Sequence, residues 1–148
     1  MLSDRLFKIV MAVVAVVGFV MLMVFSVNSG KDASLGNLDR GTWNLATLVL
    51  DDTETAVIAG TNPTIEFGDE QVAGTGGCNS YQGGYQTDGP TLSVGPVAVT
   101  ERFCQDPAGV SDQEAVFLAH LTSADEFQID DDRLILSAGG ARLMVLTR

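Results

Sequence analysis

An uninterrupted apolar run near the N-terminus is the first strong pattern in the chain. Ile9–Val27 is built from Val, Ala, Met, Leu, Ile and Phe and is broken only by Gly18 and Ser26. A helix that crosses a bilayer needs about 20 apolar residues, whereas the apolar core of a cleaved signal peptide has only about 7–15. We therefore predict a transmembrane signal anchor within residues 1–30. The alternatives are a signal cleaved near Gly30, which would release a secreted domain, and a buried core helix.

Beyond a polar linker at residues 31–40, short segments are separated by clusters of turn-forming residues. In most of these segments apolar and polar residues alternate, as in a strand that buries one face. Clusters such as Asp51-Asp52 and Asp88-Gly89-Pro90 mark the turns. The predicted strands are residues 42–50, 55–59, 64–67, 71–73, 84–87 and 91–94 and, toward the C-terminus, segments that contain Phe127 and Ile129, Leu134 and Leu136, and Leu143 and Val145.

A single helix interrupts the predicted strands. Ser111 and Glu114 have the spacing of a capping box, in which each side chain bonds the backbone of the other residue. The apolar stripe behind this cap comprises Val116, Phe117, His120 and Leu121. The predicted fold of residues 41–148 is α+β: an antiparallel β-sheet or partly closed β-barrel of about six to eight strands with one main α-helix, preceded by a single transmembrane helix.

Charge sets the predicted orientation and excludes one class of partner. Arg5 and Lys8 lie just before the apolar run, which favours a cytoplasmic N-terminus, a single pass through the cell membrane and a periplasmic or extracellular domain. Of the 19 Asp and Glu only Asp4 precedes residue 31, and of the 8 Lys and Arg only Arg5 and Lys8 do, which leaves a formal charge of −12. This field repels nucleic acid, so we expect no nucleic-acid partner.

The segment Gly74-Thr75-Gly76-Gly77-Cys78-Asn79 superficially suggests a phosphate-binding loop. Such a loop needs a helix directly after the glycines and usually a Lys next to Ser or Thr, and neither is present. A tight structural loop with glycines at positive φ is the better interpretation.

The remaining chemistry-bearing residues indicate no catalytic site. Cys78 and Cys104 are the only cysteines; in an exported domain they favour a disulfide, with two buried thiols as the alternative. A Cys nucleophile with His120 as its base is not supported, because no oxyanion donor or orienting acid is identifiable. Asp130-Asp131-Asp132 lacks the alternating ligands of a calcium loop. We expect no catalytic residue, no metal ligand and no cofactor, and predict that the protein is not an enzyme.

Together these landmarks resemble the META domain family, the HslJ-like family of heat-inducible bacterial envelope proteins. The resemblance extends from Gly41 to about Leu146. The residues that carry it are Trp43, Gly74, Gly76, Gly77, Cys78, Asn79, Tyr81, Gly84, Tyr85, Thr100 and Cys104. The G-x-G-G-C-N core, followed by T-x-x-x-C, is the most specific part.

The resemblance implies a compact α+β or barrel-like domain that is secreted or membrane-attached, is linked to stress and envelope maintenance, and has no catalytic residues to carry over. No Cys precedes Cys78, so attachment to the membrane rests on the N-terminal helix rather than on an acylated Cys. Our first hypothesis is a non-catalytic envelope domain that supports stress tolerance through contacts with an envelope protein. The alternative is a small-molecule binder with its ligand in a barrel mouth or between sheet and helix. A filled interior of Trp43, Phe67, Tyr81, Tyr85 and Phe117 would argue against that alternative.

Overall fold

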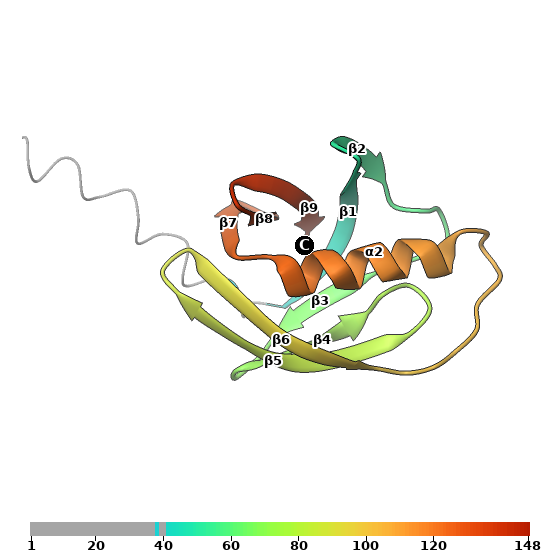
Figure 1. Ribbon diagram of the computed structural model, residues 1–148, viewed down its shortest axis with the longest axis horizontal. Helices are drawn as coiled ribbons and strands as arrows, with labels where there is room; N and C mark the ends of the chain where they lie inside the picture. The colour runs from blue at the N-terminus through green and yellow to red at the C-terminus, as the bar shows by residue number, and fades with distance from the viewer. Residues whose placement is uncertain (1–37, 39–40) are drawn as a thin grey trace, which may run out of the picture. The chain divides into compact units, whose positions relative to one another are not determined.

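The computed structural model describes Leu38 and residues 41–148. These residues form nine strands and one helix (Figure 1). The strands are β1 (Thr42–Leu50), β2 (Thr53–Ala56), β3 (Thr64–Phe67), β4 (Gln71–Thr75), β5 (Ser80–Asp88), β6 (Thr91–Val99), β7 (Glu126–Asp130), β8 (Arg133–Ala138) and β9 (Ala141–Thr147). The helix α2 (Val110–Ser123) lies between β6 and β7 in the sequence.

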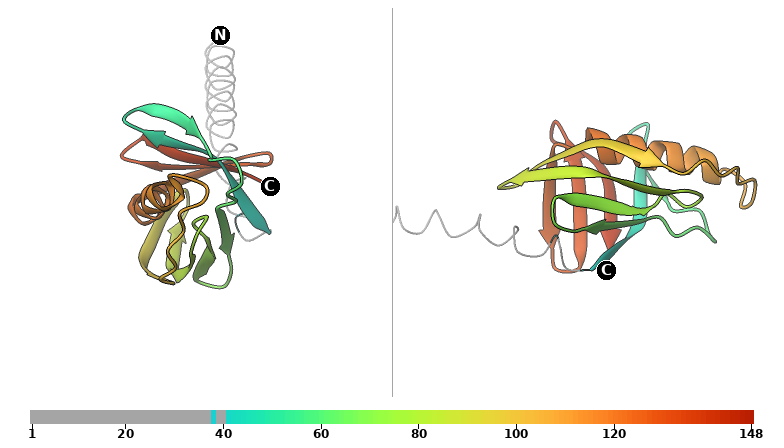
Figure 2. Two further views of the ribbon diagram at one scale, coloured as in Figure 1. Left: turned by 90° about the vertical axis from the view of Figure 1, so that its right-hand side faces the viewer. Right: turned by 90° about the horizontal axis from the view of Figure 1, so that it is seen from below.

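The strands form one antiparallel sheet whose two ends meet. The strand order is β2-β1-β3-β4-β5-β6-β7-β8-β9, and β1 also pairs with β9. One side of β1 is shared, since residues 42–44 pair with β3 and residues 47–50 pair with β2; the other side pairs with β9. The sheet therefore returns to β1 as a ring, as the views in Figure 2 show, and among the described strands β2 pairs with β1 alone. The predicted antiparallel sheet with one helix is confirmed.

The pairing of neighbouring strands in the ring is shortest between β6 and β7. One ladder pair, Thr91 with Glu126, joins these strands. Two more backbone hydrogen bonds of 2.9 Å support it, from Leu92 to the Asp125 carbonyl and from Phe127 to the Pro90 carbonyl. Because α2 packs against both β6 and β9, the helix bridges the two parts of the sheet that meet at this seam.

The hydrophobic core lies between α2 and the inner face of the ring. Phe117 and Leu121 of α2 are fully buried, and so are Trp43 and Ile65 of the sheet. The rings of Tyr81 and Phe117 meet edge to face with centroids 5.8 Å apart. All five aromatic side chains of the predicted interior, Trp43, Phe67, Tyr81, Tyr85 and Phe117, belong to this core or pack against it. The interior of the ring therefore holds these aromatic side chains.

The number and lengths of the strands differ from the sequence prediction. Nine strands replace the expected six to eight. The sequence predicts a strand only from Gly84 and an end at Val94, whereas β5 begins at Ser80 and β6 continues to Val99. A bulge between Gly83 and Tyr85 keeps the ladder between these two strands intact. The predicted strand at 55–59 is instead Thr53–Ala56.

The face of β9 that meets the core is also different from the predicted one. Met144 and Leu146 are fully buried and lie opposite the buried leucines of β8. Leu143 and Val145, which we expected on this face, lie on the other side of the strand, where Leu143 stays partly exposed. The run 143–146 is apolar on both faces, so alternation alone could not select the buried one.

The predicted signal anchor in residues 1–30 lies outside the described residues, as does the predicted linker 31–40 apart from Leu38. Leu38 is 5% exposed, and its carbonyl accepts a hydrogen bond of 3.0 Å from Nε1 of Trp43, so this residue packs with the domain. Within the described part of the chain, no helix combines the length and the apolar character needed to cross a membrane.

Candidate functional site

The glycine-rich loop, residues 74–79, includes the end of β4 and leads into β5, and three of its positions require glycine for separate reasons. A Cβ on Gly74 would lie 2.0 Å from the carbonyl oxygen of Thr64 on β3. A Cβ on Gly76 would lie 2.7 Å from Oε2 of Glu114 on α2. Gly77 has a φ of 114°, which side chains disfavour. The loop therefore lets both β3 and α2 approach its backbone closely.

The carboxylate of Glu114 occupies the hydrogen-bond donors of this loop. Oε2 accepts hydrogen bonds from the backbone N–H of Cys78 at 3.0 Å and from that of Asn79 at 2.6 Å. Oε1 accepts a hydrogen bond of 2.7 Å from Nδ2 of Asn79. Glu114 is 7% exposed, and neither salt bridge in the described part of the chain includes it. Successive backbone N–H groups that converge on one point form an anion-binding nest. Here the anion is a side chain of the protein itself, which supports the structural interpretation of the loop over the phosphate-binding one.

Asn79 connects this loop to the end of β6. Its Oδ1 accepts hydrogen bonds from Oγ1 of Thr100 at 2.9 Å and from the backbone N–H of Arg102 at 2.7 Å. Its Nδ2 donates to Glu114. Since both ends of the amide are engaged, Asn79 fixes the relative positions of the loop, the helix and the segment after β6. Thr100, a motif residue, is placed by the same contact.

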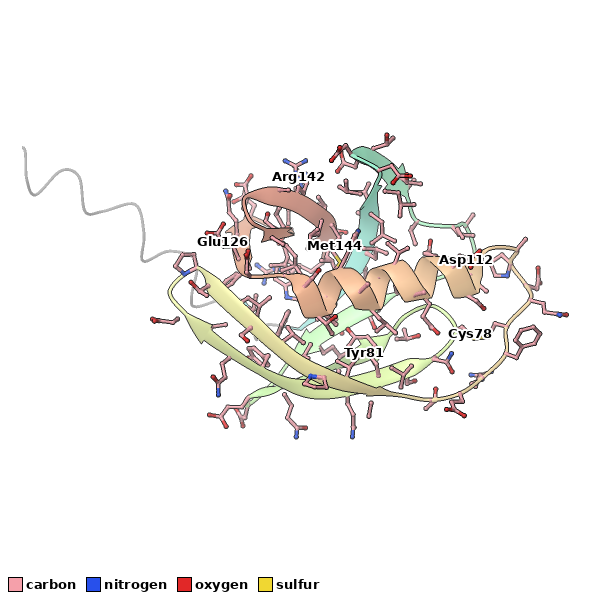
Figure 3. The ribbon with its side chains drawn as sticks, viewed as in Figure 1. Cys78, Tyr81, Asp112, Glu126, Arg142 and Met144 are labelled. Carbon is pink, nitrogen blue, oxygen red and sulfur yellow. A yellow bond between two sulfur atoms is a disulfide. The ribbon has the colours of Figure 1, made fainter. Side chains whose placement is uncertain are left out.

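Cys78 and Cys104 form the predicted disulfide. The S–S distance is 1.98 Å and the Cα atoms are 5.9 Å apart, within the range that a disulfide requires. Cys104 lies in the loop between β6 and α2, so the bond ties this loop to the start of β5. Figure 3 shows Cys78 at the same end of the domain as Asp112, which lies in the first turn of α2.

The start of α2 differs from the predicted capping box. Gly109, with a φ of 85°, is the N-cap residue, and no side chain in the described part of the chain caps the helix. Oγ of Ser111 donates instead to the carbonyl of Cys104 at 3.1 Å. Glu114 reaches the glycine-rich loop. The predicted cap is wrong because tertiary partners take both side chains away from the helix N-terminus.

Gln113 forms a second contact between α2 and a loop, and sequence reasoning missed it. Its Oε1 accepts the backbone N–H of Ile58 at 2.7 Å, and its Nε2 donates to Oγ1 of Thr61 at 2.9 Å. Gln113 and Glu114 are adjacent, are both buried, and hold different loops. A buried amide beside a buried carboxylate leaves no signal in the sequence, because both residue types are usually exposed on a helix.

His120 and the aspartate triplet take part in structural contacts. Nε2 of His120 forms a hydrogen bond of 2.7 Å with the carbonyl of Val49, and both cysteines are oxidised, so a thiol–imidazole pair does not form. Asp131 has a φ of 54° in the β7–β8 turn, and Nε of Arg148 lies 3.1 Å from Oδ1 of Asp132. Among the described residues, no group of three or more His, Cys, Asp or Glu could hold a metal ion.

The motif tyrosines hold the backbone of neighbouring segments. The hydroxyl of Tyr81 donates to the carbonyl of Thr64 at 2.8 Å, and that of Tyr85 donates to the carbonyl of Gly68 at 2.9 Å. Burial raises the pKa of Tyr81 well above its ordinary value, so this hydroxyl stays protonated. A Cβ on Gly84 would meet nothing closer than 3.8 Å, so packing does not explain this motif glycine.

The described surface has an apolar pocket beside the start of α2. Its volume is about 190 Å³, and its lining includes Leu48, Leu50, Thr55, Ile58, Asp112 and Val116. A wider and more open depression of about 660 Å³ lies against Leu38, Phe67 and Phe127. The pocket beside α2 has no reactive group in its wall apart from the carboxylate of Asp112.

Comparison with solved structures gives the same fold. An NMR structure of a protein from Burkholderia xenovorans matches with a TM-score of 0.61 and 26% identity, over 75% of this chain and 83% of that one. A second NMR structure matches with a TM-score of 0.57 and 15% identity, over 74% and 89%. The crystal structure of a DUF4847 family protein from Bacteroides vulgatus ATCC 8482 matches with a TM-score of 0.51 and 17% identity, over 74% and 92%.

The search of curated proteins returned no match. The family model of the META domain, in contrast, matches residues 36–148, which is more than half of the chain and includes the glycine-rich loop, the disulfide and α2. The chain therefore belongs to the META domain family, as the G-x-G-G-C-N motif predicted.

Proposed function

We propose that this protein is a non-catalytic envelope domain, held at the outer face of the cell membrane by residues 1–30, that supports stress tolerance through protein contacts. The observation that carries the proposal is the use of the polar motif residues. Glu114, Asn79 and Gln113 each bond a loop of the domain itself, and the two cysteines bond each other. The engagement of these residues in the domain's own structure supports a non-catalytic role.

The compartment in this proposal is supported by two features of the sequence and structure. The apolar run after Arg5 and Lys8 has the length of a spanning helix and the charge bias of one with a cytoplasmic N-terminus. The disulfide requires an oxidising compartment, which the outer face of the membrane provides and the cytosol does not.

Two experiments test the proposal. Protease treatment of spheroplasts should degrade the domain and leave a short membrane-bound fragment; a protected domain would overturn the orientation. A deletion strain should lose viability under heat or envelope stress, and in vivo crosslinking should capture the same envelope protein in repeated experiments. A deletion strain with full tolerance under every stress and no reproducible crosslink would overturn the function.

A small-molecule binder is the second candidate, and the apolar pocket beside α2 favours it. Its volume of about 190 Å³ is smaller than the roughly 300–1,000 Å³ of ordinary ligand sites, so the pocket suits a single aliphatic group better than a drug-sized molecule. Native mass spectrometry of protein purified from the membrane tests this candidate. A retained mass that disappears in Val116→Phe, which fills the pocket, would support it.

A further inference from the structure

We propose that β2 and the apolar pocket beside α2 form one docking surface for an extended, positively charged peptide segment that adds as a strand to β2. The inference rests on the proposed function, because it gives the partner of that function a place and a chemistry. Three features of the described residues carry it: an open strand edge, a pocket next to that edge, and acidic residues around both.

β2 has an open edge with free backbone groups. Thr53–Ala56 is exposed along its whole length and pairs with β1 alone. The backbone N–H of Val57 donates to the carbonyl of Ala46, and bonded positions alternate along an antiparallel pair, so Thr53 and Thr55 bond β1. The N–H and C=O groups of Glu54 and Ala56 therefore point away from β1, and no described residue bonds them.

The apolar pocket lies next to this edge, on one face of the β1–β2 ribbon. Cross-strand partners share a face, and both members of the pair Leu48–Thr55 line the pocket. An added strand alternates its side chains in the same way. Its residue opposite Thr55 would therefore point toward the pocket, whose volume of about 190 Å³ accommodates one leucine-sized side chain.

The other face of the ribbon is acidic. Val49 and Glu54 pair there, and Asp52 and Arg142 lie beside them. Oε1 of Glu54 lies 3.7 Å from Nη1 of Arg142, and both side chains are about half exposed. Arg142 offsets the charge of Glu54, so the remaining negative charge of the ribbon lies on Asp51 and Asp52 in the adjoining turn.

The two faces of the β1–β2 ribbon favour one order of basic and apolar residues in the partner segment. The added residues opposite Glu54 and Ala56 would point to the face that carries Glu54, and the residue between them would point to the pocket, whose lining includes Ala56 and Asp112. Basic–apolar–basic in an extended segment satisfies both faces. Strand addition takes its affinity from main-chain hydrogen bonds and its specificity from such pockets.

The probe is the acetylated peptide Ser-Thr-Lys-Leu-Lys-Thr-Ser, titrated into the full-length chain in non-ionic detergent micelles and followed by NMR of the backbone amides. We expect saturable shifts centred on Glu54 and Ala56, together with slower hydrogen exchange at those two amides. In an antiparallel addition the residues opposite Glu54 and Ala56 exchange backbone hydrogen bonds with them, so N-methylation of either Lys should abolish binding, whereas N-methylation of Leu should not. Absence of saturable shifts up to millimolar peptide, or equal loss with all three N-methyl peptides, would overturn the proposal.

Matched variants separate the edge, the pocket and the charge. Ala56→Pro removes one outward N–H and leaves the β1–β2 ladder intact, so it should weaken binding at least roughly tenfold without unfolding the domain. Val116→Phe should block the pocket, while Ala119→Phe on an exposed face of α2 should not. Asp51→Asn with Asp52→Asn removes two charges and keeps residues that tolerate their positive φ, so binding should weaken and should depend less on salt concentration. Unchanged binding in Ala56→Pro would overturn the proposal.

Other occupants of this edge give distinct results. Self-association in sedimentation velocity that Ala56→Pro abolishes, without peptide binding, would assign the edge to a second copy and overturn the proposal. An envelope protein that crosslinks through another face, with no peptide response at β2, would also overturn it and would leave the proposed function standing.

Discussion

Glu114 and Asn79 show how the bonds of one residue restrict those of another. Asn79 donates to Glu114 through Nδ2 and accepts from Thr100 and Arg102 through Oδ1. If the amide turned over, it would lose both accepted hydrogen bonds. The orientation of Asn79 is therefore set by Thr100 and Arg102, and the acceptor that this orientation needs on α2 is a carboxylate.

Replacing Glu114 with Gln should destabilise the domain by about 1–3 kcal/mol. The two backbone N–H groups and Nδ2 of Asn79 need acceptors on both oxygens, and Gln supplies only one oxygen. Urea unfolding of the two proteins measures the difference. The control is Asp112→Asn, an exposed change in the same helical turn, which should stay within about 0.5 kcal/mol. Equal losses in the two variants would contradict the assigned role.

Tyr81 makes the stability of the domain depend on alkaline pH. Burial, followed by the nearby Glu66, raises its pKa, whereas a tyrosine in the unfolded chain ionises near pH 10. A raised pKa in the folded state gives stability that is complete below about pH 10 and falls as the pH rises above it, because only the unfolded chain then releases the proton. The free energy of unfolding should therefore fall more steeply above about pH 10 in the wild type than in Tyr81→Phe.

The measurement is a series of urea unfolding curves for both proteins across this pH range. Tyr81→Phe also loses the hydrogen bond to Thr64, so it should be less stable at neutral pH. The two stabilities should then approach each other as the pH rises. Parallel pH profiles would show that Tyr81 does not produce the dependence.

At the scale of elements, the glycine-rich loop is defined by what packs against it. Gly76→Ala would place a Cβ 2.7 Å from Oε2 of Glu114, and we expect a loss of roughly 1–3 kcal/mol as the helix start is displaced. Gly68→Ala is the matched control, since its Cβ would meet nothing closer than 3.8 Å. Thermal unfolding of both variants tests the comparison. An equally large loss in Gly68→Ala would mean that the conformational effect of replacing a glycine, not the contact with α2, explains the destabilisation by Gly76→Ala.

The strands that the sequence predicted best are those with strong turn residues at their ends. β1 and β3 match their predicted bounds because Asp51-Asp52, Pro63 and Gly68 punctuate them. β5 was predicted too short, because Gly83 continues the glycine-rich segment before it and resembles a loop locally, although a bulge beside it carries the ladder to β6. β6 was predicted to end at Val94 and continues to Val99. Local patterns record turn chemistry, whereas a bulge depends on the partner strand.

The site was predictable where the residue type limits the chemistry. Two cysteines in an exported domain have one possible pairing, and the disulfide prediction is confirmed. The role of Glu114 was not predictable. A Ser and a Glu three residues apart satisfy a capping box from local spacing alone, and only the approach of the glycine-rich loop reassigns the carboxylate. Gln113 had no local signal, since its partners lie 52 and 55 residues away.

At the scale of the whole molecule, the disulfide holds the loop before α2 against the start of β5. The linked residues are 26 positions apart, so Cys104→Ser should destabilise the domain by roughly 3 kcal/mol. Urea unfolding of the wild type with and without reductant measures the same quantity. The double variant Cys78→Ser with Cys104→Ser is the control, because reductant should not change its stability. A wild type that is insensitive to reductant while its thiols become reactive would contradict this role.

The pairing of β1 with β9 has a consequence for the time at which the domain can first become complete. Asn44 and the carbonyl of Thr147, which this pairing brings together, are 103 residues apart in the chain. A ribosome adds about 5–20 residues per second, so β1 exists for roughly 5–20 s before β9 has been made. During this interval the side of β1 that will bond β9 is open, and the apolar residues Leu45 and Leu48 lack their final cover. The nascent chain therefore exposes this strand edge during synthesis, and a factor that protects the chain from aggregation would act there.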